Sequence, residues 1–352
     1  MTKTIFLTLA ISLLASSLGF TSCKESTKSV TVNADSLNLS PDSIILPDTA
    51  ANRIAMADSS WETAAKTFSA DPQPVEDTTN ASGRNLKIEK RGKPKISPLG
   101  VGDPYRPQEL KDGLAKARNG DLRGAIADFD ICIEKNYKNY NAYFYKAKAL
   151  IELNEPQNAL PNLNKAIEYN QSNAMFFYYR GKLLFDTGNT NDAITDFEKA
   201  IALKPDFVDA LNYRGVIKEV RGMHKEAIED FDAAIKANPD FATAYYNKGT
   251  SEAALELYSD AIVSFSKCVE LDAKKTMGYM NRGNCYVMIK DYKSAIGDYS
   301  TVISLDPKNA DAYYNRGAAY QFAGDKNACN DWRKAQSLGN KKAAEVLKNY
   351  CK

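Results

Sequence analysis

Hydrophobic and polar positions repeat with a fixed period over the C-terminal two-thirds of the chain. The stretch from Asp209 to Phe241 contains two apolar stripes at helical spacing, separated by a turn with a glycine and closed by a proline. The following stretch, Thr243 to Lys275, carries the same pattern 34 residues later. A constant period of this length is typical of stacked repeats, so the pattern predicts a series of helical hairpins.

Small residues recur with the same period, and each needs a packing reason because a glycine inside a helix costs about 1 kcal/mol relative to alanine. The first row is Gly113, Ala147, Gly181, Gly215, Gly249, Gly283 and Gly317. A second small row and an aromatic or leucine row follow it, for example Ala227 and Phe231 in the unit of Gly215. Pro205, Pro239 and Pro307 close three units, where a proline ends one helix before the next. We expect each unit to be a helix pair whose small residues let the two axes approach.

These positions resemble the tetratricopeptide repeat family, whose unit has small residues at positions 8, 20 and 27, an aromatic at 24 and proline at 32. Seven units match over residues 106–339: 106–139, 140–173, 174–207, 208–241, 242–275, 276–309 and a shortened one from 310 to about 339. The resemblance implies an all-α fold, a right-handed superhelical α-solenoid. A last helix over 340–352 is expected to be the cap that the end of a solenoid requires.

Cations occupy unit position 7, where leucine is usual in the family: Lys146, Arg180, Arg214, Lys248, Arg282 and Arg316. An aspartate follows each arginine by sixteen residues, or by fifteen in the shortened unit: Asp196, Asp230, Asp298 and Asp331. Because position 7 lies on the stripe that faces the second helix, we expect an Arg–Asp pair inside each of these units. An anion-binding row is the alternative interpretation.

By helical periodicity, unit positions 2, 5, 6, 9, 12 and 13 of each first helix should point into the concave groove. In units 2 to 4 positions 5, 6 and 9 carry aromatic rings and two lysines: Phe144, Tyr145, Lys148, Tyr178, Tyr179, Lys182 and Tyr213. Such a surface is suited to burying an aromatic or aliphatic side chain beside an acidic group.

Further along, the same groove positions are rich in asparagine: Asn212, Tyr246, Asn247, Met280, Asn281, Asn284, Tyr314 and Asn315. An amide side chain can both donate to and accept from an extended peptide backbone. Asn247, Asn281 and Asn315 resemble the asparagine ladders by which some family members hold extended peptides, and the resemblance implies that role for these three. The alternative is that the asparagines are solvated and that the tyrosines pack on their neighbours.

The first residues have the pattern of a targeting segment. Lys3 gives a positive start, and the apolar run from Ile5 to Leu18 is shorter than the about 20 residues that span a bilayer. The run ends at Phe20-Thr21-Ser22-Cys23, which resembles the lipobox of a bacterial lipoprotein precursor with Phe in place of the usual Leu. The resemblance implies a signal peptide over 1–22 and acylation of Cys23, with Lys24 favouring the outer membrane of a Gram-negative envelope. Ordinary secretory cleavage with a free Cys23 is the alternative.

Residues 23–105 carry too little apolar bulk to offset the ordering entropy of a core, so we expect a lipid-anchored, disordered linker. Within it, Ser59-Ser60-Trp61-Glu62 has capping-box spacing ahead of Ala64, Ala65 and Phe68. This segment is either a transient turn or a short element that docks on the chain's own groove.

Charge and composition exclude several classes of function. Lys plus Arg number 46 against 44 for Asp plus Glu, which predicts neither nucleic-acid nor membrane-surface binding. His224 is the single histidine, which argues against a histidine-rich metal site and against Ser-His or Cys-His catalysis. We therefore expect a non-enzymatic scaffold without a cofactor or metal, which binds a peptide segment or protein partner in its groove during assembly or secretion at the outer membrane. A carbohydrate-binding or enzymatic envelope protein that uses the groove is the alternative.

Export would allow disulfides among the cysteines. Cys329 and Cys351 lie on the last unit and its cap and could bridge them. Cys268 and Cys285 are a second candidate pair. Cys132 and Cys268 stand at unit position 27, where a small buried residue belongs, so packing roles are expected for both.

Overall fold

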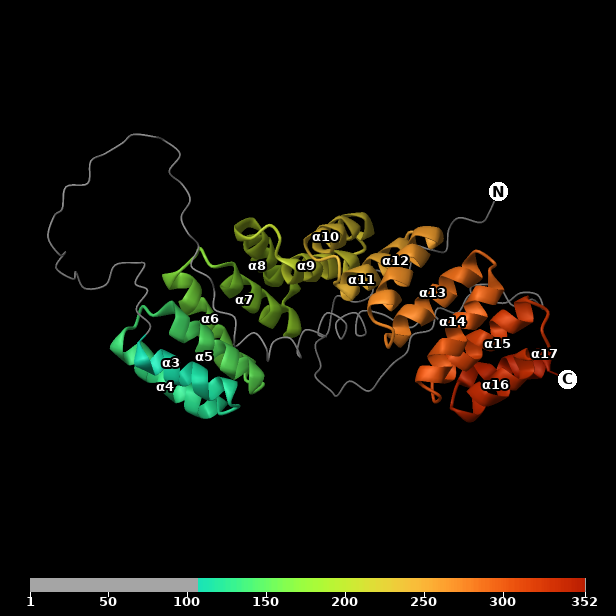
Figure 1. Cartoon of the computed structure of the whole chain (residues 1–352), viewed down its shortest axis with the longest axis horizontal. Coiled ribbons are helices and arrows are strands. Elements are labelled where there is room, and N and C mark those ends of the chain that lie inside the picture. Colours follow the sequence, from blue (N-terminus) through green and yellow to red (C-terminus); the bar gives the residue numbers. More distant parts are fainter. Residues whose placement is uncertain (1–106, 352) are drawn as a thin grey trace, which may run out of the picture.

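The computed structural model describes residues 107–351, and within this range the chain forms fifteen helices and no strand. The predicted signal peptide, Cys23 and the linker lie outside the described residues. Helices follow one another along an elongated stack, from α3 at one end to α17 at the other (Figure 1). Their bounds are α3 Gln108–Arg118, α4 Leu122–Lys135, α5 Tyr140–Glu152, α6 Pro156–Tyr169, α7 Ala174–Asp186, α8 Thr190–Leu203, α9 Val208–Val220, α10 His224–Ala237, α11 Ala242–Ala254, α12 Tyr258–Leu271, α13 Thr276–Met288, α14 Tyr292–Leu305, α15 Ala310–Phe322, α16 Ala328–Ser337 and α17 Lys341–Tyr350.

Each helix between the two ends packs on the helix before it and the helix after it, and the closest contacts lie inside the seven pairs from α3/α4 to α15/α16. These pairs fall within the seven units that the sequence predicts, and α17 packs on α16 at the end of the stack. The prediction of an all-α solenoid of helix pairs is therefore confirmed. None of the helices described in 107–351 is long and apolar enough to cross a membrane.

The recurrent small residues allow the two helices of a pair to approach closely. A Cβ atom added to Gly215 would lie 2.5 Å from Cε1 of Phe231, and one added to Gly283 would lie 2.8 Å from Cε1 of Tyr299. Both aromatic rings are fully buried. The glycine and the ring therefore form one packing unit, because the ring fills the space that a side chain on the first helix would occupy.

The first helices of the repeats lie on the inner side of the stack. Besides their own partners, α9, α11, α13 and α15 each contact the first helix of a neighbouring repeat, and α3, α5 and α7 do the same. Helices approach most closely on the inner side of a curved stack, so the first helices line the concave face. Their exposed side chains are the ones that a ligand in the groove would meet.

Candidate interaction surface on the inner face

The arginines of unit position 7 are held inside their own repeats. Arg214 donates from Nε and Nη2 to the two carboxylate oxygens of Asp230, at 2.9 and 2.6 Å. Arg180 with Asp196, Arg282 with Asp298 and Arg316 with Asp331 have the same two-bond geometry. The four aspartates are buried, so the carboxylates that pair with the arginines have little access to solvent. All four predicted pairs are present, and these arginines form structural pairs.

Each of the two lysines at unit position 7 pairs with an aspartate that the sequence analysis did not predict. Lys248 donates at 2.7 Å to Asp232, and Lys146 donates to Asp130. Both aspartates lie on the second helix of the preceding repeat, sixteen residues before the lysine. The sequence contains this spacing, with an aspartate sixteen residues before each lysine. Only the stacking of consecutive repeats, however, brings the two residues together.

The aromatic residues expected to face the groove are mostly buried, which corrects the sequence prediction. Phe144, Tyr145, Tyr178 and Tyr213 are all under 10% exposed, as are Tyr246, Met280 and Tyr314. Their rings pack between repeats. The ring centre of Phe144 lies 4.8 Å from that of Phe176, and Tyr213 stacks on Phe197 with 5.3 Å between the ring centres. The prediction treated these positions of each first helix as free, whereas side chains of adjacent helices cover them, both first helices (Phe176 of α7) and second helices (Phe197 of α8).

The asparagine ladder is also directed inward rather than toward a ligand. Asn247 donates to Asn212 at 2.8 Å, and both side chains are buried. Asn315 donates to Asn284 at 3.2 Å, again between buried side chains. The expectation that Asn247 and Asn315 offer their amides to a peptide backbone is therefore wrong. A buried amide needs hydrogen-bond partners, and the asparagines provide part of these for one another.

Asn281 differs from the other asparagines because it stays partly exposed. Its amide donates to the hydroxyl of Tyr246 at 3.1 Å, across the junction of α11 and α13. Asn281 is therefore the one member of the three predicted ladder residues whose side chain a ligand could also reach.

A strip of cations and rings remains on the inner face of α5 and α7. The amine of Lys148 lies 5.1 Å from the ring centre of Tyr179 and 5.8 Å from that of Phe144, at cation–π distance. Burial lowers the pKa of Lys148 to about 8, opposed by the nearby Glu152 carboxylate. A desolvated ammonium group beside aromatic rings binds an anionic group more strongly than a solvated one.

Lys182 takes the equivalent place one repeat further along. Its amine lies 3.1 Å from the carboxylate of Asp186 and 5.7 Å from the ring centre of Tyr213. Tyr179 is partly exposed between the two lysines in sequence order, on the same helix as Lys182. We call Lys148, Tyr179 and Lys182 the lysine–tyrosine strip.

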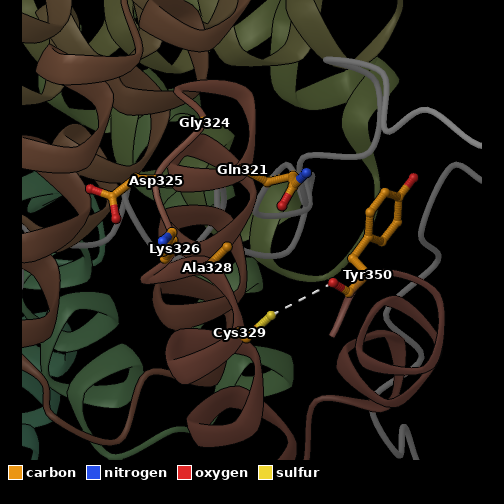
Figure 2. A pocket seen from close by; sticks show the side chains of 7 residues that line it. All are labelled: Gln321, Gly324, Asp325, Lys326, Ala328, Cys329 and Tyr350. Atoms are coloured by element: carbon orange, nitrogen blue, oxygen red, sulfur yellow. Dashed lines mark hydrogen bonds between the residues drawn. The ribbon is translucent and has the colours of Figure 1, made fainter. Parts of the chain in front are cut away.

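At the C-terminal end, Cys329 and Cys351 form a disulfide that joins α16 to the residue after α17. Cys132, Cys268 and Cys285 are free and buried, so the alternative Cys268–Cys285 pair does not form. A hollow of about 280 Å³ includes Cys329 in its lining. Figure 2 shows the seven residues that line it: Gln321, Gly324, Asp325, Lys326, Ala328, Cys329 and Tyr350. It lies far along the stack from the lysine–tyrosine strip (Figure 1). Within 107–351 no group of three or more His, Cys, Asp or Glu residues could hold a metal ion.

Two models of the same repeat family match the chain. Residues 181–219 and 283–324 match the TPR repeat model, and residues 110–174 and 219–274 match the tetratricopeptide repeat model. Together the matched segments cover more than half of the chain. No curated protein sequence matches it.

Solved structures show the same fold. The C-terminal part of a TPR repeat-containing protein from Cytophaga hutchinsonii is 22% identical with a TM-score of 0.57, covering 68% of this chain and 99% of that one. A tetratricopeptide repeat protein from Parabacteroides merdae is 22% identical with a TM-score of 0.50, covering 69% and 97%. YrrB, described as a TPR protein with an unusual peptide-binding site, is 26% identical with a TM-score of 0.49, covering 53% and 97%.

Proposed function

Because this chain is a tetratricopeptide repeat protein, we propose that it is an interaction scaffold which binds a polypeptide segment on its inner face, at the lysine–tyrosine strip. Family membership supports the protein-interaction role. The finer proposal is that the bound segment carries an acidic group next to an aromatic or aliphatic side chain. The carboxylate would lie against Lys148 and Lys182, and the apolar side chain would pack on Tyr179.

The observation that carries the proposal is a buried lysine followed, in the next repeat, by a half-buried lysine at the equivalent position. Lys148 is 6% exposed, and the side chain of Lys182 is 12% exposed. Burial of a lysine opposes its charged form, and the pKa of Lys148 is lowered for this reason. A bound carboxylate would relieve that cost at Lys148, and Lys182, whose amine lies 3.1 Å from Asp186, adds a second positive charge to the strip, so the strip favours an anionic ligand over a neutral one.

A photo-crosslinking residue at position 179 tests this site in the living cell. We expect it to capture one partner, and we expect Lys148→Met together with Lys182→Met to abolish the capture. Lys165→Met together with Lys267→Met is the matched control, because both of these lysines lie in exposed i,i+3 pairs. Capture that survives the first double variant would refute the role of the strip.

We also propose that Cys23 is acylated and holds the scaffold at the outer membrane of a Gram-negative envelope, in an assembly or secretion process. The lipobox-like sequence supports acylation, and the Cys329–Cys351 disulfide supports an oxidising compartment such as the periplasm or the cell surface. Incorporation of labelled palmitate should be lost in Cys23→Ala. Unchanged labelling would refute the anchor and leave the binding site untouched.

A further inference from the structure

The turns inside the repeats form one rim of the stack, and in three consecutive repeats this rim is apolar. Val220, Met223, Leu257 and Ile289 are 50%, 41%, 45% and 44% exposed. They lie at the turns of α9/α10, α11/α12 and α13/α14, which follow one another along the solenoid (Figure 1). We call these four residues the apolar rim.

Two rim residues, Met223 and Leu257, stand where other repeats have a polar N-cap residue that stabilises the second helix. Asp121, Asn189 and Asp291 each accept a hydrogen bond from a backbone N–H in the first turn of α4, α8 and α14. Met223 and Leu257 stand at the same N-cap position of α10 and α12 and make no such bond. Giving up a cap destabilises a helix, and exposing an apolar side chain in its place adds to the cost. An exposed apolar patch obtained in this way is typical of a contact surface.

The size of the apolar rim limits what can cover it. Together the four half-exposed side chains offer on the order of 300 Å² of apolar surface, which is the lower end of the range for the largest apolar patch on a monomer. A second copy of the chain would need about 800 Å² on each partner for a stable interface. One tryptophan and one phenylalanine bury about 150–250 Å² each, so a short segment with two aromatic rings fits the rim far better.

The chain itself contains such a segment before the first repeat. Trp61, Ala64, Ala65 and Phe68 have the i, i+3, i+4, i+7 spacing of a helix that lays one apolar face on a partner surface. Charged residues of both signs accompany this apolar pattern, namely Asp58, Glu62 and Lys66. The exposed charged turn residues beside the rim carry both signs as well: Arg221, Glu256 and Lys290.

The length of chain between the segment and the first helix permits this contact. The roughly 40 residues from Phe68 to Pro107 would span about 30–40 Å as a coil and more when extended. Packed helices lie about 8–10 Å apart, so the fourth to sixth repeats, which carry the rim, begin roughly 30–50 Å from the first. The segment can therefore reach the apolar rim without any rearrangement of the solenoid.

We propose that residues 59–68 of this chain, with Trp61 and Phe68 as anchors, occupy the apolar rim of Val220, Met223, Leu257 and Ile289. The rim lies on α9 to α14, whereas the lysine–tyrosine strip lies on α5 and α7. The proposal is therefore independent of the proposed function, and either can fail without the other. Docking would also fold part of the linker back along the solenoid and shorten the distance between Cys23 and the repeats.

Pairwise cysteine crosslinking in the purified full-length chain tests the contact. Ser60→Cys, next to the Trp61 anchor, is combined with Glu256→Cys, at the exposed turn position next to Leu257, so that both anchors and the rim stay intact. Val263→Cys replaces Glu256→Cys in the matched control, since Val263 is 70% exposed and lies further along the second helix. A short bis-maleimide should link residues 60 and 256 within one molecule at several times the yield of residues 60 and 263. Equal yields, no link at 256, or a link between two molecules would each overturn the proposal.

Tryptophan emission gives a second measurement in the otherwise unchanged chain. Trp332 is fully buried, so a change in quenching by iodide reports Trp61. Leu257→Asp should raise the quenching constant several-fold, and Val263→Asp should leave it unchanged. Loss of fold is not a concern in Leu257→Asp, because aspartate already caps the equivalent helix at Asp291. An unaltered quenching constant in Leu257→Asp contradicts docking at the rim.

Discussion

Lys248 of the fifth repeat donates a 2.7 Å hydrogen bond to Asp232 of the fourth repeat. Arg214 occupies the same unit position as Lys248 but donates forward, to Asp230 in its own repeat. The arginine fork matches both oxygens of one carboxylate, whereas the lysine amine acts as a point charge and lies 2.7 Å from Asp232 and 3.7 Å from Glu252 of its own helix. The two arrangements thus stabilise different junctions: one within a repeat and one between repeats.

Removal of Asp230 should destabilise the solenoid far more than removal of Asp232. Asp230 is 3% exposed and accepts from Arg214 and Lys218, so Asp230→Ala leaves two half-buried cations without their partner. We expect a loss of about 2–4 kcal/mol in the free energy of unfolding. The side chain of Asp232 is 52% exposed, and Asp232→Ala should cost less than about 1 kcal/mol. Urea unfolding compares the two variants; equal losses would contradict the assignment.

Loss of the Cys329–Cys351 disulfide should loosen the end of the solenoid without affecting the other repeats. The bond closes a loop with a sequence separation of 22 residues, for which about 2–4 kcal/mol of stabilisation is expected. In Cys329→Ser, amide hydrogen exchange should therefore accelerate in α16 and α17 and stay unchanged in α5 to α10. Reduction of the native chain should give the same exchange pattern, and uniform acceleration along the chain would argue against a local cap.

Glycine should stabilise the turns at which the backbone is left-handed. Lys290 has φ 65° and Glu256 has φ 61°, while the equivalent turns of other repeats contain Gly120, Gly188 and Gly222. A side chain in this conformation costs about 1–2 kcal/mol, and part of this is offset by the greater unfolded-state freedom of glycine.

We therefore expect Lys290→Gly and Glu256→Gly each to raise the unfolding free energy by about 0.5–1 kcal/mol. Asn154, at φ 57°, is the matched control because asparagine tolerates this region, so Asn154→Gly should change little. Thermal unfolding of the three variants measures the difference. A gain of the same size in Asn154→Gly would show that backbone strain is not the cause.

The free energy of unfolding should rise with pH above about pH 8 because the pKa of Lys148 differs between the folded and the unfolded chain. Burial lowers the pKa of Lys148 from 10.5 to about 8 in the folded chain, so the unfolded chain binds more protons between these values. In that interval the free energy of unfolding increases by at most about 1.4 kcal/mol per pH unit, whereas below about pH 8 this residue contributes no slope. The difference in the free energy of unfolding between the native chain and Lys148→Met, measured by urea unfolding at a series of pH values, should show the same slope between about pH 8 and pH 10.

Lys165→Met serves as the control for this measurement, because Lys165 lies in an exposed pair with Glu168. A flat difference between the native chain and Lys148→Met across pH 8–10 would mean that Lys148 keeps its proton in the folded state. Binding of an acidic segment at the lysine–tyrosine strip should weaken over the same pH range, since the Lys148 charge is lost there.

The sequence by itself determined the repeat. Period, small residues and aromatic fillers are local and recur at fixed spacing, so Gly215 and Phe231 could be matched before any contact was known. The Arg–Asp pairs followed from the same reasoning, because both partners belong to one helix pair. Contacts within a repeat are determined by helical periodicity over a short stretch of chain.

Only the tertiary structure decided what lies between repeats and what remains on the surface. Asn247 and Asn315 have the spacing of exposed inner-face residues, yet the neighbouring first helix covers them and accepts their hydrogen bonds. The same stacking pairs Lys248 with Asp232 of the preceding repeat. It also brings Lys148 and Tyr179 together in the lysine–tyrosine strip. Periodicity specifies the direction of a side chain around its own helix, but burial depends on how closely the next helix packs, which no single repeat specifies.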